Sequence, residues 1–392
     1  MIELLDFARN LFRQELEPPP GFIFSRPLVA IQSDDWGRLG LRDREGYEWL
    51  RAHGVKLGEH PYDLYSFETA EDVTAIASLF SRHRDSSGRA PCMVMTFCTS
   101  NLDFKKMKAQ GYKGIELLPL SEGLPGSWSR PGLLEAYRAG IQTGVFYPAM
   151  HGLTHFCPVG VETALAKRGE RADLLRLFWE AETPYIYWRM PWIGYEYWNP
   201  EKPHAGFLPA DMQRSQISKA RQSFTALFGT PPVSACAPGY FANRDTRRMW
   251  AEMGIRVAQN GTGSGLNAPY IDGTGILHLH RTIDLEPSQR ELEVDKYLQI
   301  AGNCFARGLP LIISTHSINF HSTLKDFRTS TLAALDLLLT ALESKYPDLL
   351  YVHDQDLYAI VTEGAFESRD TRVTVSARRQ DWKARVAHQG AM

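Results

Sequence analysis

The sequence has 392 residues, of which 44% are hydrophobic and 22% are charged, so it can bury a large core and a disordered chain is disfavoured. Its 43 basic and 45 acidic residues nearly cancel, which disfavours a nucleic-acid partner because such proteins usually present a basic face. The length is that of one large α/β domain with insertions.

The N-terminal segment and the cysteines bear on the compartment. Residues 1–20 alternate apolar and charged side chains and lack the basic start and unbroken apolar stretch of a signal peptide. No run of about 18 apolar residues occurs, so no membrane span is expected. The cysteines are scattered without a CxxC pair, which favours reduced thiols and a cytoplasmic protein; they are Cys92, Cys98, Cys157, Cys236 and Cys304.

The first element expected along the chain is an amphipathic N-terminal helix within residues 1–20, which ends before Pro18. Short apolar runs then recur, each with the length of a buried parallel strand: Leu28–Ile31, Met93–Phe97, Val145–Met150, Val233–Ala237, Ile255–Ala258, Ile276–Leu279, Leu311–Ser314 and Leu349–Val352. Helical patterns separate many of them, at about 71–83, 131–142, 210–228, 244–253, 290–307 and 323–345.

This alternation over residues 21–364 predicts an α/β domain with a parallel sheet, either a barrel or a doubly wound sheet. Polar residues follow several strands directly: Asp34 and Asp35 follow the first, His151 the third and His316 the seventh. In a βα barrel these places lie on one rim, where active sites are built. Their separation in sequence is therefore no obstacle to a common site.

Two segments fall outside this rhythm. Residues 160–208 contain a predicted helix followed by an aromatic stretch, PYIYWRMPWIGYEYWNP, and are interpreted as an insertion into the domain. Residues 365–392 have few apolar side chains and are predicted to form a flexible tail.

The motif HGLTH places His151 and His155 four residues apart. On a helical turn the two imidazoles would share one face, about 5–6 Å apart at Cβ, and could bind one cation. Because an HxxxH pair alone is weak evidence, surface or core histidines without a ligand are the alternative interpretation.

The motif SDDWG places two carboxylates, Asp34 and Asp35, at the end of an apolar strand. Such a pair is costly to bury unless water, a cation or a hydrogen-bond donor satisfies it. Adjacent residues of an extended strand point to opposite faces, but at a strand end they can enter one pocket with separate roles. One aspartate would then bind a metal and the other would act as a base; a helix N-cap or an Asx-turn is the alternative.

The motif STHS places His316 at the end of another apolar strand. The ordinary pKa of histidine, about 6.5, suits a general acid at neutral pH. A rim histidine hydrogen-bonded to the backbone is the alternative interpretation.

These motifs, in this order, resemble the polysaccharide deacetylase superfamily, the carbohydrate esterases with NodB homology. SDDWG resembles its first motif, HGLTH its second, ACAPGYFANRDTRRMWAEMGIRVAQN its third with the following helix, and ISTHS its last. The resemblance runs from about Leu28 to Ile360. It implies a distorted (β/α)7 barrel of the glycoside hydrolase/deacetylase type, which agrees with the expected strands.

The resemblance implies a metal-dependent hydrolase that removes acetyl groups from an N-acetylated sugar or polysaccharide, acting on carbon–nitrogen bonds other than peptide bonds. The family's metal ligands match Asp35, His151 and His155, its catalytic base matches Asp34 and its catalytic acid matches His316. Such a site binds one divalent cation; zinc is expected, and cobalt, nickel and iron also suit these ligands.

Candidate substrate contacts are Trp36, Tyr240 and Arg281, and a backbone N–H near Tyr240 would stabilise an oxyanion together with the metal. The third motif of the family usually has an arginine ahead of its proline, whereas here Cys236 and Ala237 stand there. Arg281 is expected either to replace that arginine, pairing with the base, or to form a plain surface salt bridge.

The family's fourth motif, an Asp-Trp pair, is not evident, and Asp284 or Glu286 is the candidate for its carboxylate. Cys157 lies two residues beyond the second motif and is interpreted as a buried thiol in preference to a further metal ligand. The aromatic residues of the insertion either form a substrate wall or pack the insertion onto the barrel; they are Tyr185, Tyr187, Trp188, Trp192, Tyr195, Tyr197 and Trp198.

Two other functions fit these residues. A glycoside hydrolase on a similar barrel would use two carboxylates about 5–10 Å apart, one from Asp34 or Asp35 and one from Asp284 or Glu286. A non-catalytic carbohydrate-binding protein would keep the fold without turnover. All three functions share a carbohydrate partner, and metal content separates the hydrolase from the glycosidase.

Overall fold

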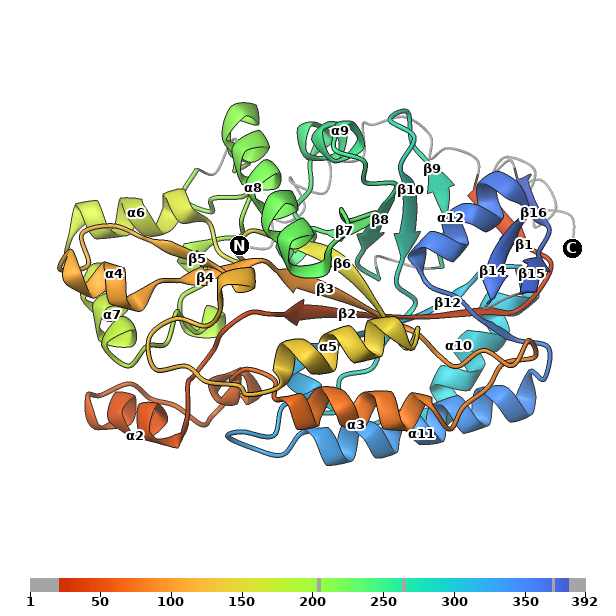
Figure 1. The fold of residues 1–392 in the computed structure, drawn as a ribbon, viewed down its shortest axis with the longest axis horizontal. Coiled ribbons are helices and arrows are strands. Elements are labelled where there is room, and N and C mark those ends of the chain that lie inside the picture. The colour runs from red at the N-terminus through yellow and green to blue at the C-terminus, as the bar shows by residue number, and fades with distance from the viewer. Residues whose placement is uncertain (1–20, 203–205, 263–265, 369–370, 381–392) are drawn as a thin grey trace, which may run out of the picture.

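The computed structural model describes residues 21–202, 206–262, 266–368 and 371–380. The helix expected within residues 1–20 lies outside this part of the chain. A curved sheet of parallel strands forms the centre of the molecule (Figure 1). Its main strands are β2 (Leu28–Trp36), β3 (Met93–Cys98), β6 (Phe146–Gly152), β7 (Ser234–Cys236), β8 (Val257–Asn260), β10 (Leu277–His280), β11 (Ile283–Asp284) and β12 (Leu311–His316).

The order of these strands makes the sheet a distorted barrel. Along the path β11-β12-β2-β3-β6-β7-β8-β10 every neighbouring pair is parallel. The last main strand, β12, therefore returns to pair with the first, β2. The barrel stays open at one seam, between β10 and β11, because no pairing joins these two strands in the described residues. The predicted α/β fold, a distorted (β/α)7-type barrel, is confirmed by this topology.

Two short strands complete the sheet. Strand β13 (Leu350–Tyr351) pairs in parallel with the amino end of β2, and β9 (Tyr270–Ile271) pairs antiparallel with β10. The residues of β2 and β3 are buried throughout, as expected for parallel strands whose two faces are covered.

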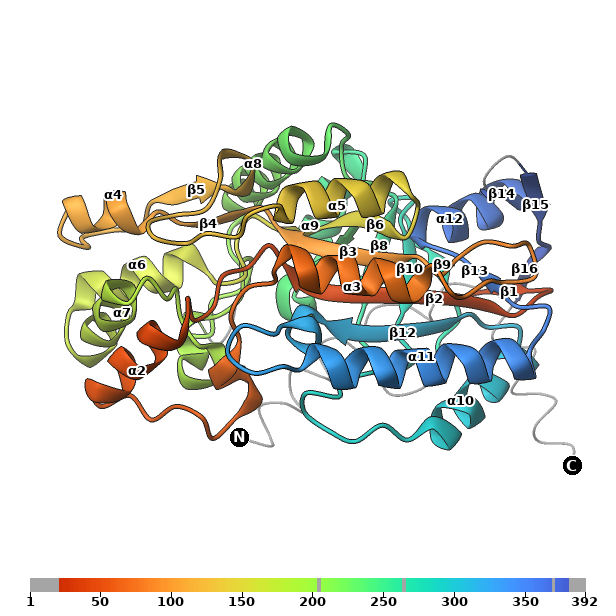
Figure 2. The ribbon, with the colours of Figure 1, turned by 60° about the horizontal axis from the view of Figure 1, so that its bottom comes forward.

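Helices cover the outside of the barrel, and all of them except the one at Asp354–Glu363 lie where the sequence predicted a helix. Figures 1 and 2 show α3, α10 and α11 along one side and α8 and α9 along the other. The helices are α3 (Ala70–Phe80), α5 (Leu133–Gln142), α8 (Ala210–Phe228), α9 (Arg244–Glu252), α10 (Val294–Ala306), α11 (Arg328–Lys345) and α12 (Asp354–Glu363). None of the described helices is long and apolar enough to cross a membrane.

Further elements surround the carboxyl ends of the strands, at the left of Figure 1. The helices there are α2 (Arg44–Ala52), α4 (Phe104–Ala109), α6 (Pro158–Lys167) and α7 (Glu170–Glu180), with the strands β4 (Ser100–Leu102) and β5 (Leu117–Pro119). Short 3-10 turns lie at Pro61–Leu64, Leu120–Glu122, Tyr187–Arg189, Pro191–Ile193, Pro238–Tyr240 and Ser317–Phe320. The predicted insertion thus contributes α6, α7 and two of these turns.

The prediction of a flexible tail is wrong for residues 365–368 and 371–380, where the structure has three strands. Strands β14 (Ala365–Ser368) and β15 (Thr371–Thr374) pair antiparallel, and β16 (Ala377–Gln380) pairs antiparallel with β1 (Gly21–Phe24). Backbone pairing holds this segment in place although it has few apolar residues, and Phe366 and Val375 add buried side chains to it. Residues 381–392 lie outside the described part.

Candidate active site

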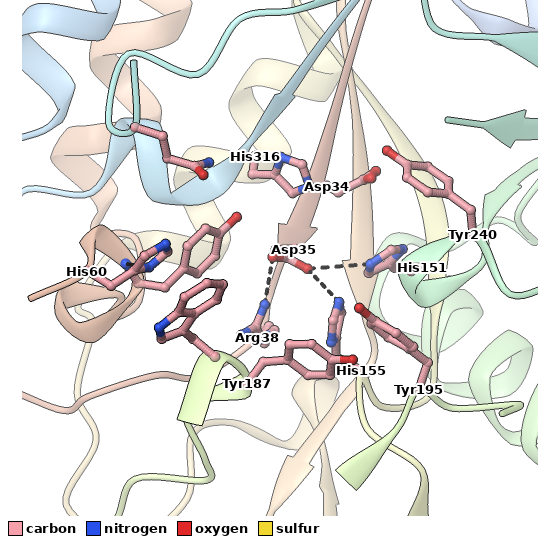
Figure 3. A pocket seen from close by; sticks show the side chains of 14 residues that line it. Asp34, Asp35, Arg38, His60, His151, His155, Tyr187, Tyr195, Tyr240 and His316 are labelled. Atoms are coloured by element: carbon pink, nitrogen blue, oxygen red, sulfur yellow. Dashed lines mark hydrogen bonds and ion pairs between the residues drawn. The ribbon is translucent and has the colours of Figure 1, made fainter. Parts of the chain in front are cut away.

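The end of strand β2 departs from regular geometry at the two adjacent aspartates. The register of β2 against β3 shifts between Ser33 and Trp36, and Asp35 has a φ of +74°. This left-handed conformation is uncommon for a residue other than glycine and is found at functional sites. It lets Asp34 and Asp35 both line one cavity, although neighbouring residues of a regular strand point to opposite faces (Figure 3).

Asp35, His151 and His155 converge on one point. Asp35 Oδ1 lies 3.4 Å from His151 Nε2 and 3.2 Å from His155 Nε2. Asp35 Oδ1 and His151 Nε2 are buried, and neither has a hydrogen-bond partner in the described part of the chain. Buried polar atoms without partners are rare in folded proteins, and two imidazole nitrogens with a carboxylate oxygen are a common donor set for a divalent cation. These residues therefore fit the metal that the sequence resemblance implies.

Hydrogen bonding and burial give both histidines the form that a metal requires. The Nδ1 of His151 donates to the carbonyl oxygen of Cys236 at 2.9 Å, which leaves the Nε2 lone pair free toward Asp35. Burial lowers the pKa of His155 well below its ordinary value, so its imidazole is neutral. The third group is anionic: burial tends to raise the pKa of Asp35, but Arg38 and the other polar groups around it together hold that pKa well below its ordinary value.

The two histidines meet across a bend and not on a helical turn, which corrects the sequence-based expectation. His151 is in β6, and the chain bends directly after Gly152. Glu196 of the insertion fixes this bend, since both its carboxylate oxygens accept the backbone N–H of Leu153, at 3.0 and 3.1 Å. Glu196 is fully buried, and sequence analysis did not identify it.

Arg38 is a second residue that sequence analysis missed. Its Nη1 lies 2.6 Å from Asp35 Oδ2, the oxygen opposite to the one that faces the histidines. The guanidinium also lies over the ring of Tyr65, 4.5 Å from its centroid. The signal available in the sequence was the spacing of three residues from Asp35.

Asp34 is held by the other arginine of the site. Arg281 Nη1 and Nη2 each lie 2.6 Å from a different carboxylate oxygen of Asp34, and Thr96 Oγ1 donates to Oδ1 at 2.8 Å. Burial tends to raise the pKa of Asp34, but Arg281 and the nearby histidines together lower it below its ordinary value, so the carboxylate is ionised. Arg281 is fully buried, which excludes the surface salt bridge and also a direct substrate contact.

His316 lies next to Asp34 at the rim, because the two residues are register partners of β12 and β2. Its Nδ1 is 2.6 Å from Glu286 Oε1, and Asn319 Nδ2 donates to the other Glu286 oxygen at 2.6 Å. Burial tends to lower the pKa of His316, but Glu286 raises it to about 9, so the imidazole is protonated at neutral pH. Of the two candidates for the fourth-motif carboxylate, the structure places Glu286, not Asp284, against the histidine.

One cavity of about 380 Å³ holds these groups together. Figure 3 shows Asp35 at its centre, with Asp34 and His316 on one side and Tyr187 and Tyr195 on the other. The lining residues are Asp34, Asp35, Arg38, His60, Tyr62, His151, His155, Tyr187, Trp188, Tyr195, Gly239, Tyr240, Gln289 and His316.

Of the other two expected substrate contacts, the structure excludes Trp36 and keeps Tyr240 at the cavity. The Trp36 side chain is fully buried, donates from Nε1 to Ser33 Oγ at 2.9 Å, and stacks on Phe320, so it does not line the cavity. Tyr240 does line the cavity, but its backbone N–H donates to the carbonyl of Ala237 at 2.8 Å and is not available for an oxyanion. Its hydroxyl instead accepts a hydrogen bond from Arg281 at 2.6 Å.

Some aromatic residues of the insertion line the cavity, and the others pack against the rest of the chain. Tyr187, Trp188 and Tyr195 line the cavity, and Tyr187 stacks on Tyr195 with ring centroids 4.8 Å apart. Trp188 is 63% exposed and stacks on His60 at 4.4 Å, which places both rings at the mouth. The others pack elsewhere: Tyr185 and Tyr197 are buried, Trp192 lies under Arg171, and Trp198 stacks on Phe241.

Cys157 is a buried thiol and belongs to neither of the groups in the described residues that could hold a metal. Those groups are Asp35 with His151 and His155, and Asp34 with His151 and Cys236. The second group is already occupied by hydrogen bonds, since Asp34 pairs with Arg281 through both oxygens.

Comparison with known proteins gives structural likenesses only. No family model and no curated protein matches the sequence. A polysaccharide deacetylase, so named, from Mycobacterium smegmatis is 13% identical with a TM-score of 0.47, covering 88% of this chain and 92% of that one. A protein named as a glycoside hydrolase/deacetylase from Parabacteroides distasonis is 13% identical with a TM-score of 0.49, covering 90% and 74%.

A third solved structure, Puue allantoinase, is 15% identical with a TM-score of 0.43, covering 89% of this chain and 95% of that one. The chain is similar in its course to solved polysaccharide deacetylases. At these identities and scores the likeness concerns the path of the chain, and the chemistry of the site follows from its own side chains.

Proposed function

We propose that this chain is a metal-dependent hydrolase that removes an acetyl group from an N-acetylated sugar or polysaccharide. One observation carries the proposal. A donor set for a cation (Asp35, His151 and His155) shares a single cavity with a carboxylate and a protonated imidazole, Asp34 and His316. Hydrolysis of an amide needs a proton acceptor for the attacking water and a proton donor for the leaving nitrogen, and this cavity supplies both.

The cation would be held by Asp35, His151 and His155. When bound, it polarises the carbonyl oxygen and makes water more acidic, which allows attack near neutral pH. Zinc suits three such ligands with one open position, and cobalt, nickel and iron are also compatible. The pairing of Asp35 with Arg38 leaves one carboxylate oxygen, Oδ1, for the cation.

The two proton-transfer groups are oriented by separate partners. Asp34 is ionised and takes the proton of the attacking water, while Arg281 and Thr96 fix its carboxylate. His316 is protonated and gives its proton to the departing nitrogen, while Glu286 fixes its ring through Nδ1. In each pair the partner is buried, so it acts on the proton-transfer group and not on the substrate.

The shape of the cavity supports a carbohydrate substrate. Its volume of about 380 Å³ lies within the range of small-molecule sites, roughly 300–1,000 Å³. The rings of Tyr187, Tyr195 and Trp188 offer flat faces, on which the apolar faces of a sugar ring can pack.

The glycosidase alternative is disfavoured by the partners of the carboxylates. Glu286 is buried and binds His316 and Asn319, so it does not line the cavity. Asp284 does not line the cavity either, and it lies 3.8 Å from Arg290. A glycosidase would require one of them opposite Asp34 or Asp35 across the sugar.

The test combines metal analysis of the purified protein with acetate release from a panel of N-acetylated and O-acetylated glycans. We expect one divalent cation per chain and acetate release from at least one N-acetylated member. The matched control is Asp34→Asn, which keeps the shape of the side chain but is not a useful base, and should keep the metal while losing about 10²–10⁴-fold in kcat. Glycan binding without acetate release by the metal-loaded protein would contradict the proposal and support a binding protein.

A further inference from the structure

A buried polar cluster lies beneath Asp34, inside the barrel. Gln32 precedes Asp34 by two residues on β2, so the two side chains point to the same face, into the interior. Gln259 of β8 and Asp354, the first residue of α12, reach the same space. Helix α12 lies at the end of the barrel away from the site (Figure 1). All three side chains are at most 3% exposed.

Arg281 is bound by this cluster on the side away from Asp34. Its Nε donates to Gln32 Oε1 at 3.2 Å, and its Nη2 donates to Gln259 Oε1 at 3.0 Å. The guanidinium therefore touches Asp34 on one side and two amide oxygens on the other. A planar donor with acceptors on several sides has little freedom to rotate.

The same two glutamines bind Asp354 through their nitrogens. Gln32 Nε2 donates to Asp354 Oδ1 at 2.7 Å, and Gln259 Nε2 donates to Oδ2 at 2.7 Å. The hydroxyl of Ser234 donates to Oδ2 as well. Both oxygens of Asp354 accept these hydrogen bonds, although burial raises the pKa of this carboxyl group. As a carboxylate it has no proton to donate, so it selects the amide orientation in which each glutamine turns its N–H₂ toward Asp354. The opposite end of each amide, the oxygen, must then face Arg281.

We propose that Asp354 is a positioning residue for Asp34: it sets the orientation of the Gln32 and Gln259 amides, and these fix the Arg281 guanidinium that holds Asp34. The proposal rests on the proposed function for the role of Asp34. It adds a residue of the last helix, outside all of the motifs, to the set on which turnover depends. We call this chain of hydrogen bonds, from Asp354 through Gln32 and Gln259 to Arg281, the relay.

Asp354→Asn tests this relay because the side chain keeps its size. The amide of the new residue would point a donor at one glutamine nitrogen, so that glutamine would have to turn and present N–H₂ to Arg281. Arg281 would lose an acceptor, and its hold on Asp34 would change. We expect kcat to fall about 10–100-fold, the range for changes to outer-shell partners, with KM and metal content unchanged.

The matched control is Asp356→Asn on the same helix. Asp356 is also buried and ionically paired, with Arg89 at 2.6 Å, but it touches neither glutamine. It should leave kcat unchanged. If Asp354→Asn does not fold, Gln259→Met, which keeps the length and removes both hydrogen-bonding ends, replaces it with the same expected loss.

A double-mutant cycle separates positioning from general stability. In the Asp34→Asn background, Asp354→Asn should cause no further loss of the residual kcat, because the group through which it acts is already gone. An equal fold loss in both backgrounds, or an unchanged kcat in the single variant, would overturn the proposal.

A crystal structure of Asp354→Asn tests independently of turnover whether Asp354 controls the contact between Arg281 and Asp34. We expect Arg281 no longer to contact both oxygens of Asp34 within hydrogen-bond distance. Retention of both contacts would refute the relay. Absence of acetate release from the wild-type protein would instead refute the proposed function, while the crystallographic result would still hold for the relay.

Discussion

Asp34 and Arg281 form a two-point ion pair although 247 residues separate them in sequence. Arg281 lies directly after β10 and before β11, at the seam where the barrel is open. Its side chain enters the interior there and is fully buried. The partner of the proposed base thus comes from the seam and not from the third motif, where Cys236 stands close to the same carboxylate, with its Sγ 3.7 Å from Asp34 Oδ2.

Replacement of either histidine of the donor set should remove the cation. We expect His151→Ala and His155→Ala each to lose most of the bound metal, because two ligands and an open cavity bind a cation weakly. Metal analysis after gel filtration measures this. The control is His278→Ala, a buried histidine that pairs with Asp272 outside the cavity, which should keep the metal. Full metal content in both His151→Ala and His155→Ala would show that the cation binds elsewhere.

His316→Ala should affect amides more than activated esters. An amide nitrogen leaves poorly unless it is protonated, whereas an activated aryl alcohol leaves without help. We expect a loss of about 10²–10⁴-fold in kcat on an N-acetylated sugar, a clearly smaller loss on an aryl acetate, and unchanged metal content. Equal, small losses on both substrates would give His316 a structural role, and loss of metal would make it a ligand.

Glu286→Gln should move the alkaline limb of the kcat profile to lower pH. Burial tends to lower the pKa of His316, but Glu286, together with Asp35 and Asp34, raises it to about 9. The protonated acid, and with it kcat, is therefore present at lower pH and lost as the pH rises through that value. Without the anion the pKa of His316 falls, by about 1–3 units for a charge this close.

The pH dependence of kcat on an N-acetylated sugar measures this shift. Asp284→Asn is the matched control, since Asp284 lies two residues from Glu286 but pairs with Arg290 and not with His316. It should leave the alkaline limb in place. The assignment of Glu286 fails if its replacement leaves the limb where it is.

Trp188→Ala should weaken substrate binding while leaving the chemistry intact. Trp188 lines the cavity and is 63% exposed, which places it at the mouth. A ring contact of this kind contributes about 0.5–1.5 kcal/mol, so KM for an oligosaccharide should rise about 2–10-fold at nearly constant kcat. Trp192→Ala, in the same insertion but outside the cavity, should leave KM unchanged. Equal KM values for wild type and Trp188→Ala would assign the ring to packing.

Glu196→Gln should stabilise the protein at alkaline pH relative to wild type. Burial raises the pKa of Glu196 from its ordinary 4.5 to about 8 in the folded chain. The folded state therefore binds the proton more tightly than the unfolded state, and this contribution to stability is full below pH 4.5 and lost as the pH rises through about 8. Each unit of pKa difference corresponds to about 1.4 kcal/mol.

Glutamine does not titrate and has the shape of the protonated acid. Thermal unfolding of wild type and Glu196→Gln at several pH values between about 5 and 9 measures the effect. The difference in melting temperature should grow in favour of the variant as the pH rises. A difference that is constant across this range would show that Glu196 has the same ionisation state in the folded and unfolded chains.

The sequence by itself determined the elements and the residues at their ends. The apolar runs and helical patterns predicted β2, β3, β6, β7, β8, β10, β12 and β13 and the helices α3, α5, α8, α9, α10 and α11, because each depends on the periodicity of neighbouring residues. They did not predict β11 or α12. The strand-end positions of Asp34, Asp35, His151 and His316 followed from the same pattern, since carboxyl ends of parallel strands share one rim. The sequence predicts that Trp36 contacts the substrate, but its side chain is buried. A position next to a site in the sequence does not specify which way a side chain points.

Only the tertiary structure decided which residues pair with the residues of the site. Arg281 reaches Asp34 because the barrel is open between β10 and β11, and Glu286 reaches His316 because β11 pairs with β12. Likewise, Ala377–Gln380 are held in place because β16 pairs with β1, which lies more than 350 residues earlier in the sequence. These contacts join residues far apart in sequence, and their physical cause, pairing of buried charges and of strand edges across the fold, leaves no local pattern.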